Sequence, residues 1–409
     1  LTQTALASWW NVNWKYRREI TITNVSGTLT DYQISVELNS SNFNFSHAQE
    51  NGSDIRFVAS DGETLLNHWI ETWNSTNQSA KIWVKVPEVE GGTKIYMYYG
   101  NENASDVSDV NATFIRVIDG VVGAWHFDEG NGTIAHDTSG EGNDGTLYDA
   151  NTTNNDSNTP PQWVEGKFGK ALSFDGVDDY VEVPDDESLR KWDEITVMVW
   201  VKSLQPTWNA FRALVNKEFT GKNQWMLEPY KDSTDVEFAW HDGTSWHTSE
   251  RASIEDITKW NFIAVTKDDT YVKIFINGEL KLTDDGTAPI QEISGSPVHI
   301  GRGENNYLNA IIDEVRIYNR ALSEEEISDL YNNYGYTTPN YPNKVLVRKY
   351  TEPEPVAIVG EEEAGIFTTI ANFLTIEKEI GANYILWKWS CTNPDALVDV
   401  FVDGSEVLS

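Results

Sequence analysis

Cysteine is almost absent from this chain. One residue, Cys391, stands among 409, which excludes an intramolecular disulfide. A lack of disulfides is typical of proteins from reducing compartments. Basic residues are also scarce, since 30 Lys and Arg face 64 Asp and Glu and leave a net charge of −34. Nucleic acids and anionic membrane surfaces repel such a charge, so we expect neither as a partner.

Long apolar runs are lacking too. No stretch of about 18 apolar residues occurs, and the sequence therefore predicts no membrane-spanning helix. The chain begins LTQTALASWW, without the basic start and apolar core of a signal peptide, as a mature or trimmed end would. Any anchor is expected outside these residues.

Glycosylation acceptors, by contrast, are abundant and lie in one part of the chain. The motif Asn-X-Ser/Thr occurs eleven times, always within the first 155 residues. The acceptors are Asn24, Asn39, Asn44, Asn51, Asn74, Asn77, Asn103, Asn111, Asn131, Asn151 and Asn155. Because this one-sided density is hard to obtain by chance, we expect an exported, N-glycosylated protein.

Short strand patterns separated by turn signals dominate the chain. YRREITITNV and KIWVKVPEV, for example, alternate apolar and polar residues. Further on, Asn277-Gly278 between IFI and ELKL predicts a two-residue hairpin. The one helix expected runs from Glu324 to about Asn332, with Ser323 and Glu326 as a capping box. The sequence therefore predicts an all-β protein of tandem β-sandwich (jelly-roll) domains.

Four regions are expected along the chain. Residues 1–117 form one β domain, 118–335 a second sandwich, 336–360 a return strand and linker, and 361–409 a small β segment. This last region holds three strand patterns, about half of what an immunoglobulin-like fold requires. A piece this small is expected to dock on a neighbour, to accept a strand from another chain, or to begin a longer protein.

Several motifs carry a family resemblance, in order along the chain. They are GAWHFDEGNG, WVEGKFGKALSFDGVDDYVEVP, WNFIAVTKDDTYVKIFINGE and IDEVRIYNRALSEEEISDLY. On these, residues 118–335 resemble the laminin-G-like, concanavalin-A-like jelly-roll modules of exported proteins. Residues 8–117, with WKYRREITI and GSDIRFVASDGETLL, resemble an uncharacterised β domain found beside such modules in archaeal and bacterial surface proteins. The tail resembles the opening strands of an immunoglobulin- or fibronectin-type sandwich. The resemblance implies a fold and a cell-surface location, but no activity for the first domain.

The stretch AWHFDEGNGTIAHDTSGEGNDGTL, Ala124 to Leu147, crowds five carboxylates among glycines. A catalytic pair, a cation site and a solvated loop all fit that density. Retaining glycosidases of the concanavalin-like class carry Glu-x-Asp-x-x-Glu on one face of a strand, a pattern that we do not find here. In IDEVRIY, alternation sends Asp313 and Glu314 to opposite faces. We therefore predict that the protein is not an enzyme.

A structural calcium ion fits this loop better. Calcium binds six to eight oxygens from carboxylates, amides and backbone carbonyls. Asp128, Asp137 and Asn143 offer side-chain oxygens, while the glycines let backbone carbonyls turn inward. The resemblance implies Asp313 as a fourth ligand, because such modules often hold calcium where this loop meets the IDEVRIY strand. The alternative is a loop rich in Asx turns whose acids are simply solvated.

Tryptophans are the candidate ligand contacts. Four of them, including Trp208, lie in or near loop-rich segments, where exposed rings could stack on sugar faces. We predict ligand contacts at Trp225, Trp240 and Trp246. The alternative is core packing, which in a sandwich protein with 17 tryptophans applies to most of them.

Together these features predict an extracellular protein of a cell surface, archaeal by resemblance, with a structural or adhesive role. As a binding module, it would recognise surface glycans or protein through the jelly-roll loops. As a structural subunit, it would bind other copies of itself head to tail, one chain's N-terminal arm completing the next chain's partial sandwich in a filament or surface layer. A non-catalytic module of a secreted glycosidase is a third alternative.

Overall fold

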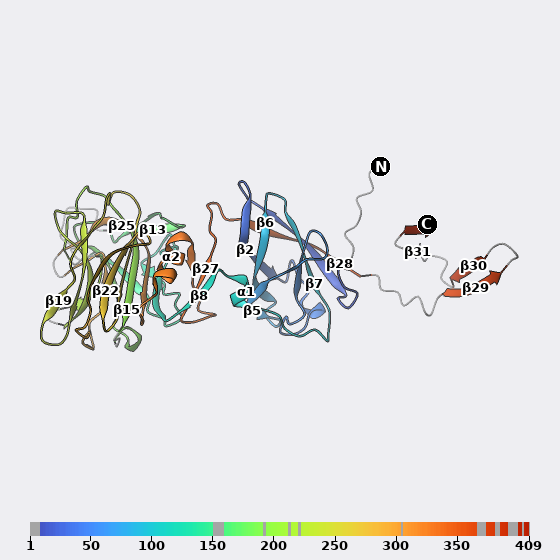
Figure 1. The fold of residues 1–409 in the computed structure, drawn as a ribbon, viewed down its shortest axis with the longest axis horizontal. Helices are drawn as coiled ribbons and strands as arrows, with labels where there is room; N and C mark the ends of the chain where they lie inside the picture. The colour runs from blue at the N-terminus through green and yellow to red at the C-terminus, as the bar shows by residue number, and fades with distance from the viewer. Residues whose placement is uncertain are drawn as a thin grey trace.

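The computed structural model describes residues 9–149, 159–190, 194–211, 214–219, 222–303, 306–365, 374–380, 385–391, 400–402 and 405–408. Regular structure in these residues is almost entirely β, which confirms the predicted fold class. Figure 1 shows two sandwiches side by side along the long axis. The longest described helix, α2 (Glu324–Asn332), has 9 residues, and none of the described helices is long and apolar enough to span a membrane.

The first domain packs two antiparallel sheets around one apolar core. Alternation produces this core, as in β2, where Ile34, Val36 and Leu38 are buried. The smaller sheet has the order β2 (Leu29–Asn39), β6 (Ser79–Val89), β5 (His68–Asn74). The larger has the order β28 (Val356–Ala364), β1 (Tyr16–Thr23), β7 (Lys94–Tyr99), β3 (Arg56–Ala59), β4 (Leu65–Leu66). Two short helices, η1 (Phe45–His47) and α1 (Val110–Thr113), lie in its loops.

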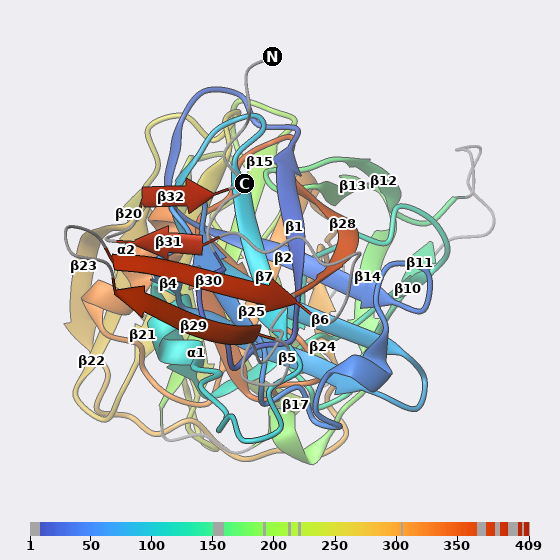
Figure 2. The same cartoon turned by 90° about the vertical axis from the view of Figure 1, so that its right-hand side faces the viewer.

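Strand β28 reaches the first domain from the far end of the chain. It pairs antiparallel with β1, from Tyr16 opposite Ala364 to Thr23 opposite Val356, and Figure 2 shows the two strands side by side. The region 336–360 was predicted as a return strand and linker; its end, at residue 360, lies inside β28, which returns to the first domain. The local sequence pattern does not show a pairing between segments more than 300 residues apart.

The second domain packs two larger antiparallel sheets face to face. One, nine-stranded, has the order β10 (Ile134–Ala135), β11 (Gly145–Asp149), β14 (Asp179–Val183), β24 (Val298–Ile300), β16 (Val215–Phe219), β17 (Lys222–Pro229), β18 (Asp235–His241), β19 (Trp246–Thr248), with β20 (Ala252–Ser253) on β18. The other, eight-stranded, has the order β12 (Gln162–Glu165), β13 (Lys170–Asp175), β25 (Asn309–Tyr318), β15 (Ile195–Ser203), β21 (Asn261–Lys267), β22 (Tyr271–Ile276), β23 (Glu279–Asp285), with β9 (Val121–Trp125) on β25. The helix η2 (Glu187–Leu189) follows β14.

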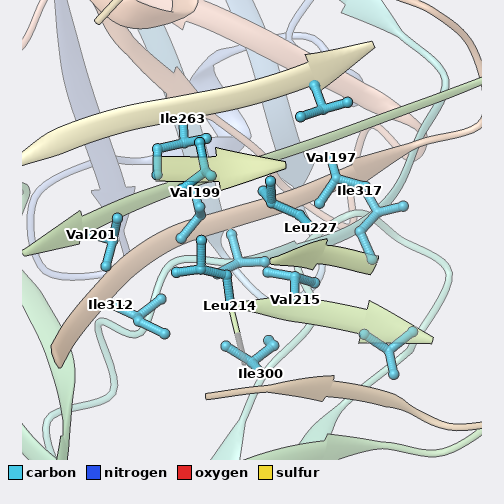
Figure 3. Close-up of a cluster of buried hydrophobic side chains, with 14 of the residues drawn as sticks. Val197, Val199, Val201, Leu214, Val215, Leu227, Ile263, Ile300, Ile312 and Ile317 are labelled. Carbon is cyan, nitrogen blue, oxygen red and sulfur yellow. The ribbon is translucent and has the colours of Figure 1, made fainter. Parts of the chain in front are cut away.

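The core of the second domain lies between these two sheets. Figure 3 shows its centre, where Val197, Val199 and Val201 of β15 face Leu227 of β17 and Ile300 of β24. All five side chains are fully buried. An apolar core of this size stabilises the domain without a disulfide, at roughly 25 cal/mol for each Å² of apolar surface buried.

Two local predictions are confirmed in this domain. Asn277 and Gly278 alone separate β22 from β23, and both have positive φ, 52° and 77°, as a tight hairpin of this type requires. Helix α2 begins at the capping box in which Ser323 and Glu326 each bond the other's backbone.

A third, three-stranded sheet joins the two domains, in the order β26 (Tyr334–Tyr336), β27 (Lys344–Arg348), β8 (Arg116–Asp119). The predicted boundary at 117 falls inside β8, a strand of this connecting sheet. Beside this sheet, the Glu71 side chain, 2% exposed, accepts hydrogen bonds from Trp83 of its own domain and from Tyr336 and Thr338. A buried carboxylate satisfied from both sides connects the two domains.

Beyond Gly365, the described residues form two hairpins. β29 (Leu374–Ile380) pairs with β30 (Ile385–Cys391), and β31 (Val400–Val402) pairs with β32 (Ser405–Leu408). The fibronectin-like resemblance of the region 361–409 stays a prediction.

Candidate functional site

The loop between β9 and β11 is held by its own carboxylates. Asp137 accepts hydrogen bonds from the backbone N–H groups of Ala124, Ser139 and Asn143, each at 2.9 Å. The Asn143 amide donates to the Val122 carbonyl at 2.8 Å and to Ser188 Oγ at 2.9 Å. Two of the four predicted calcium ligands therefore organise the loop, as the Asx-turn alternative expects.

The other two predicted ligands, Asp128 and Asp313, lie at a different place, around the turn between β12 and β13. Asp313 Oδ2 accepts from the N–H groups of Lys167 and Phe168 at 2.8 and 3.0 Å, and Asp128 Oδ1 accepts from Lys170 N–H at 2.8 Å. Asp313 Oδ1 is buried without a hydrogen-bond partner. Burial and the neighbouring Glu314 raise the pKa of Asp313 well above its usual range. A cation at Asp128 and Asp313 would relieve the repulsion between Asp313 and its neighbouring carboxylates. Calcium binding there stays a prediction.

Asp313 and Glu314 lie on the same side of β25, and the prediction that they point to opposite faces is wrong. The register against β15 shifts between Trp200 and Met198, which forms a bulge. Ile312 and Val315 both point into the core, so the two acids between them point away from it. Glu314 has φ 55°, an uncommon conformation for a residue with a side chain.

This carboxylate pair is closed to substrates. Asp313 is 0% and Glu314 1% exposed. Glu314 is bonded to His126 Nδ1 at 2.8 Å and to the Arg316 guanidinium. Burial alone would raise the pKa of Glu314, but His126 and Arg316 outweigh it and hold that pKa below its usual range. A carboxylate so held suits a structural ion pair better than a general acid, which needs a raised pKa and access to substrate.

The first domain has hollows around Tyr16 and Gly100. Two adjoining pockets there have volumes of about 800 and 310 Å³. The ion pair in them joins Lys15 and Glu102 at 2.7 Å, and its side chains are 57% and 81% exposed. Their hydrogen bond raises the pKa of Lys15 and lowers that of Glu102. Acid–base catalysis requires the opposite shifts, so these pockets give no support to an enzyme.

The structure moves the predicted ligand contacts at Trp225 and Trp240 into the core of the second domain. These side chains are 0% and 2% exposed, and Trp208 is 1% exposed. Trp225 and Trp240 are cross-strand partners on the side of the sheet that faces the core. Ligand contact by either is therefore contradicted. Trp246 is half-buried, edge-on to His241 with 5.4 Å between ring centroids, and remains a candidate.

An aromatic surface that the sequence analysis missed lies on the outer face of the nine-stranded sheet. We call Tyr148, Tyr180, Arg302 and Tyr307 the tyrosine patch. Tyr148 is 40% exposed and stacks on Tyr180, with ring centroids 5.2 Å apart and 20° between planes. The Arg302 guanidinium lies 4.5 Å from the Tyr180 ring centroid and 5.9 Å from that of Tyr307. A flat ring and a cation at one surface can hold a sugar face and an anionic group.

Local sequence dictates the orientation of this patch. Leu147 and Val181 are buried in the core, so alternation turns Tyr148 and Tyr180 to the opposite face. Tyr148 and Tyr180 are also cross-strand partners of β11 and β14. Burial raises the pKa of Tyr180 and outweighs Arg302, which keeps its hydroxyl protonated and able to donate at neutral pH. The sequence could have revealed the patch, because Tyr148 and Tyr180 each stand next to an apolar residue that points into the core.

The predicted glycosylation sites are accessible wherever the structure describes them. Nine of the eleven acceptor asparagines are in the described residues, and all nine are exposed. Asn151 and Asn155 lie outside the described residues. Exposure is required for glycan attachment, so the prediction stays consistent with the fold.

Two antiparallel sheets of this size, packed face to face over one core, define a large β-sandwich domain. Residues 175–328 match the family model of the concanavalin A-like lectin/glucanases superfamily, and residues 51–139 match a domain of unknown function, DUF2341. The protein therefore contains a laminin-G-like, concanavalin-A-like module preceded by a domain of that uncharacterised family. This confirms the resemblance found in the sequence.

Similar proteins match only parts of the chain. An uncharacterized protein of Methanocaldococcus jannaschii is 30% identical over 115 residues, which cover 25% of this chain and 21% of that protein. Domain 4 of AbnA, an extracellular arabinanase from Geobacillus stearothermophilus solved with arabinotriose, is 22% identical with a TM-score of 0.43, over 52% of this chain and 98% of that domain. The binding domain of Paraclostridial Mosquitocidal Protein 1 is 20% identical with a TM-score of 0.41, over 52% of each chain.

Proposed function

We propose that this protein is a non-enzymatic, extracellular protein of a cell surface whose jelly roll binds glycans through the tyrosine patch. The concanavalin-A-like module supports a lectin-like role, and such modules are typical of extracellular proteins. The exposed acceptor asparagines support export. The observation that carries the proposal is the exposed Tyr148 ring stacked on Tyr180 beside Arg302.

Arg302 narrows the class of glycan. Among the described residues, no carboxylate forms an ion pair with it, and its Nε is buried without a hydrogen-bond partner. In a chain of net charge −34, an arginine with no ion-pair partner in the described part of the chain, beside a stacking surface, favours a negatively charged ligand group. The ligand is therefore proposed to be an acidic glycan, one that carries a carboxylate or sulfate group.

The expected result of Tyr148→Ala is a loss of about fivefold in glycan affinity with an unchanged melting temperature. Stacking contributes on the order of 1 kcal/mol, which corresponds to that factor. The ring is 40% exposed, so its removal leaves no cavity in the core. Binding to an array of acidic and neutral glycans measures the effect, and Arg302→Met should remove the preference for acidic glycans.

Tyr271→Ala is a matched control, since that ring is 49% exposed but lies on β22 of the other sheet. It should leave glycan binding unchanged. Equal losses for Tyr148→Ala and Tyr271→Ala would contradict a site at the patch, and a wild-type protein that binds no glycan would contradict the proposed ligand class.

A structural subunit is the second candidate, and one observation favours it. Strand β28 is at the edge of its sheet, with no further partner strand among the described residues, and exposes Val356 and Ile358 at 49% and 54%. An open edge with apolar side chains can pair with a strand from another chain. Light scattering of the full chain should then show particle mass rising with concentration, and Ile358→Lys should stop that rise. Monodisperse monomers in both cases would contradict assembly.

A further inference from the structure

Three carboxylates converge at the turn between β13 and β14. Single oxygens of Asp175, Asp178 and Asp179 all lie within 4.8 Å of one another. Two ligands of one calcium ion can be at most about 4.6–5.2 Å apart, because each Ca–O distance is about 2.3–2.6 Å. The spacing of the three oxygens therefore fits a shared calcium ion.

Asp179 supplies an observation independent of this clustering. Its side chain is 3% exposed, and its Oδ1 is buried without a hydrogen-bond partner. Its other oxygen accepts from the Asp175 N–H group at 3.0 Å. A buried carboxylate oxygen with no donor costs free energy unless something positive approaches it.

The electrostatic surroundings of Asp179 are also acidic. Burial, with Asp175, Asp178 and Asp149 in addition, raises the pKa of Asp179 to about 7. Asp149 stands directly opposite Asp179, as its cross-strand partner on β11. Four carboxylates at one place repel one another at neutral pH, and a divalent cation removes that repulsion.

The position of the cluster gives the cation a structural role. Asp149 lies two residues after Leu147, and Asp179 lies two residues before Val181. Because Leu147 and Val181 point into the core, alternation places the two carboxylates on the same side, at the end of that core. Asp175 ends β13 of the eight-stranded sheet, whereas Asp179 begins β14 of the nine-stranded sheet. An ion shared by the two would tie one sheet to the other in a domain without a disulfide.

We infer that Asp175, Asp178 and Asp179 form a calcium site that closes the end of the jelly-roll core and links its two sheets. The ligands are all oxygens, the type that calcium prefers. The site is separate from the calcium site predicted at Asp128 and Asp313, and it concerns stability rather than glycan binding.

Asp179→Asn, made in the full chain, tests this inference. The amide keeps the shape of the side chain and its acceptor for the Asp175 N–H group, but removes the charge. After removal of metal with EDTA, calcium chloride should raise the melting temperature of the wild-type protein by several degrees. Asp179→Asn should lose that rise and one equivalent of bound calcium in calorimetric titration, while its melting temperature in EDTA equals or exceeds that of the wild type.

Three further variants make the result specific. Asp175→Asn, at an exposed position, should weaken calcium binding at least tenfold without the risk of misfolding. Asp313→Asn should keep this equivalent of calcium, because it lies at the other predicted site. Asp269→Asn, in an exposed turn, should change nothing.

Two outcomes would overturn the inference. One is a wild-type chain that binds no calcium at this site up to about 10 mM, well above the weakest affinities of extracellular calcium modules. The other is unchanged calcium stoichiometry and affinity in both Asp175→Asn and Asp179→Asn. Magnesium chloride is the matched ion, and it should bind more weakly, because magnesium requires shorter, near-octahedral contacts.

Discussion

Ending the chain after Pro355 is expected to unfold the first domain and leave the jelly roll folded. The cut removes β28, which pairs with β1 from Tyr16 to Thr23. Each main-chain hydrogen bond contributes about 1 kcal/mol. Ala357 and Val359, which pack against the core of the first domain, are lost as well. The sum is comparable to the whole stability of a domain, about 5–15 kcal/mol.

Charged side chains make this loss larger. Arg18, 9% exposed, donates to the Gly360 carbonyl at 2.7 Å, and the Tyr99 hydroxyl donates to Glu362 at 2.7 Å. Arg17, 4% exposed, pairs with Glu363 at 2.8 Å. Without β28, two arginines remain in a largely buried setting with fewer acceptors, which adds a desolvation penalty.

Calorimetry of the shortened chain checks this prediction. The chain ended after Gly365 is the matched control, because it keeps β28 and lacks only the tail. It should show the melting transitions of both domains, whereas the chain ended after Pro355 should show only the jelly-roll transition. The same melting profile for both chains would mean that β1 does not depend on its long-range partner.

Elements that depend on neighbouring residues were predictable from the sequence, and β28 shows where that ability ends. The hairpin at Asn277-Gly278 and the cap at Ser323 follow from local backbone chemistry, and the structure has both. The partner of β28 is β1, a strand more than 300 residues earlier in the chain. No local pattern carries that information, so the end of the first domain could not be placed.

The candidate site shows the same division. The alternation of side chains along a strand would have placed Trp225 and Trp240 in the core. Each lies two residues from a core residue, Leu227 or Phe238, and therefore on the same face of its strand. The same alternation turns Tyr148 outward, because its neighbour Leu147 points into the core. The bulge in β25 is different, because it depends on an extra residue opposite β15 and on the positive φ of Glu314. Regular alternation cannot predict such an irregularity, so it could not place Asp313 and Glu314 on the same face.

This bulge leads to the second large effect. Arg316→Met is expected to lower the free energy of unfolding of the jelly roll by about 3–5 kcal/mol, the usual cost of removing one partner of a buried ion pair. Glu314 and Arg316 are 1% and 3% exposed, and the Arg316 guanidinium also donates to the Gly335 carbonyl. The variant leaves a buried carboxylate with His126 as its remaining hydrogen-bond partner. The loss should shrink as pH falls, because protonation of Glu314 removes the uncompensated charge.

Calorimetry of the jelly-roll transition measures this loss, and a double variant separates the pair from its packing. Glu314→Gln with Arg316→Met removes both charges, so it should recover most of the stability that Arg316→Met alone loses. If the double variant is as unstable as the single one, the loss comes from the packing of the arginine stem against its neighbours. If Arg316→Met melts like the wild type, the bulge of β25 is held by its backbone and by His126, and the ion pair contributes nothing to the stability of the sandwich.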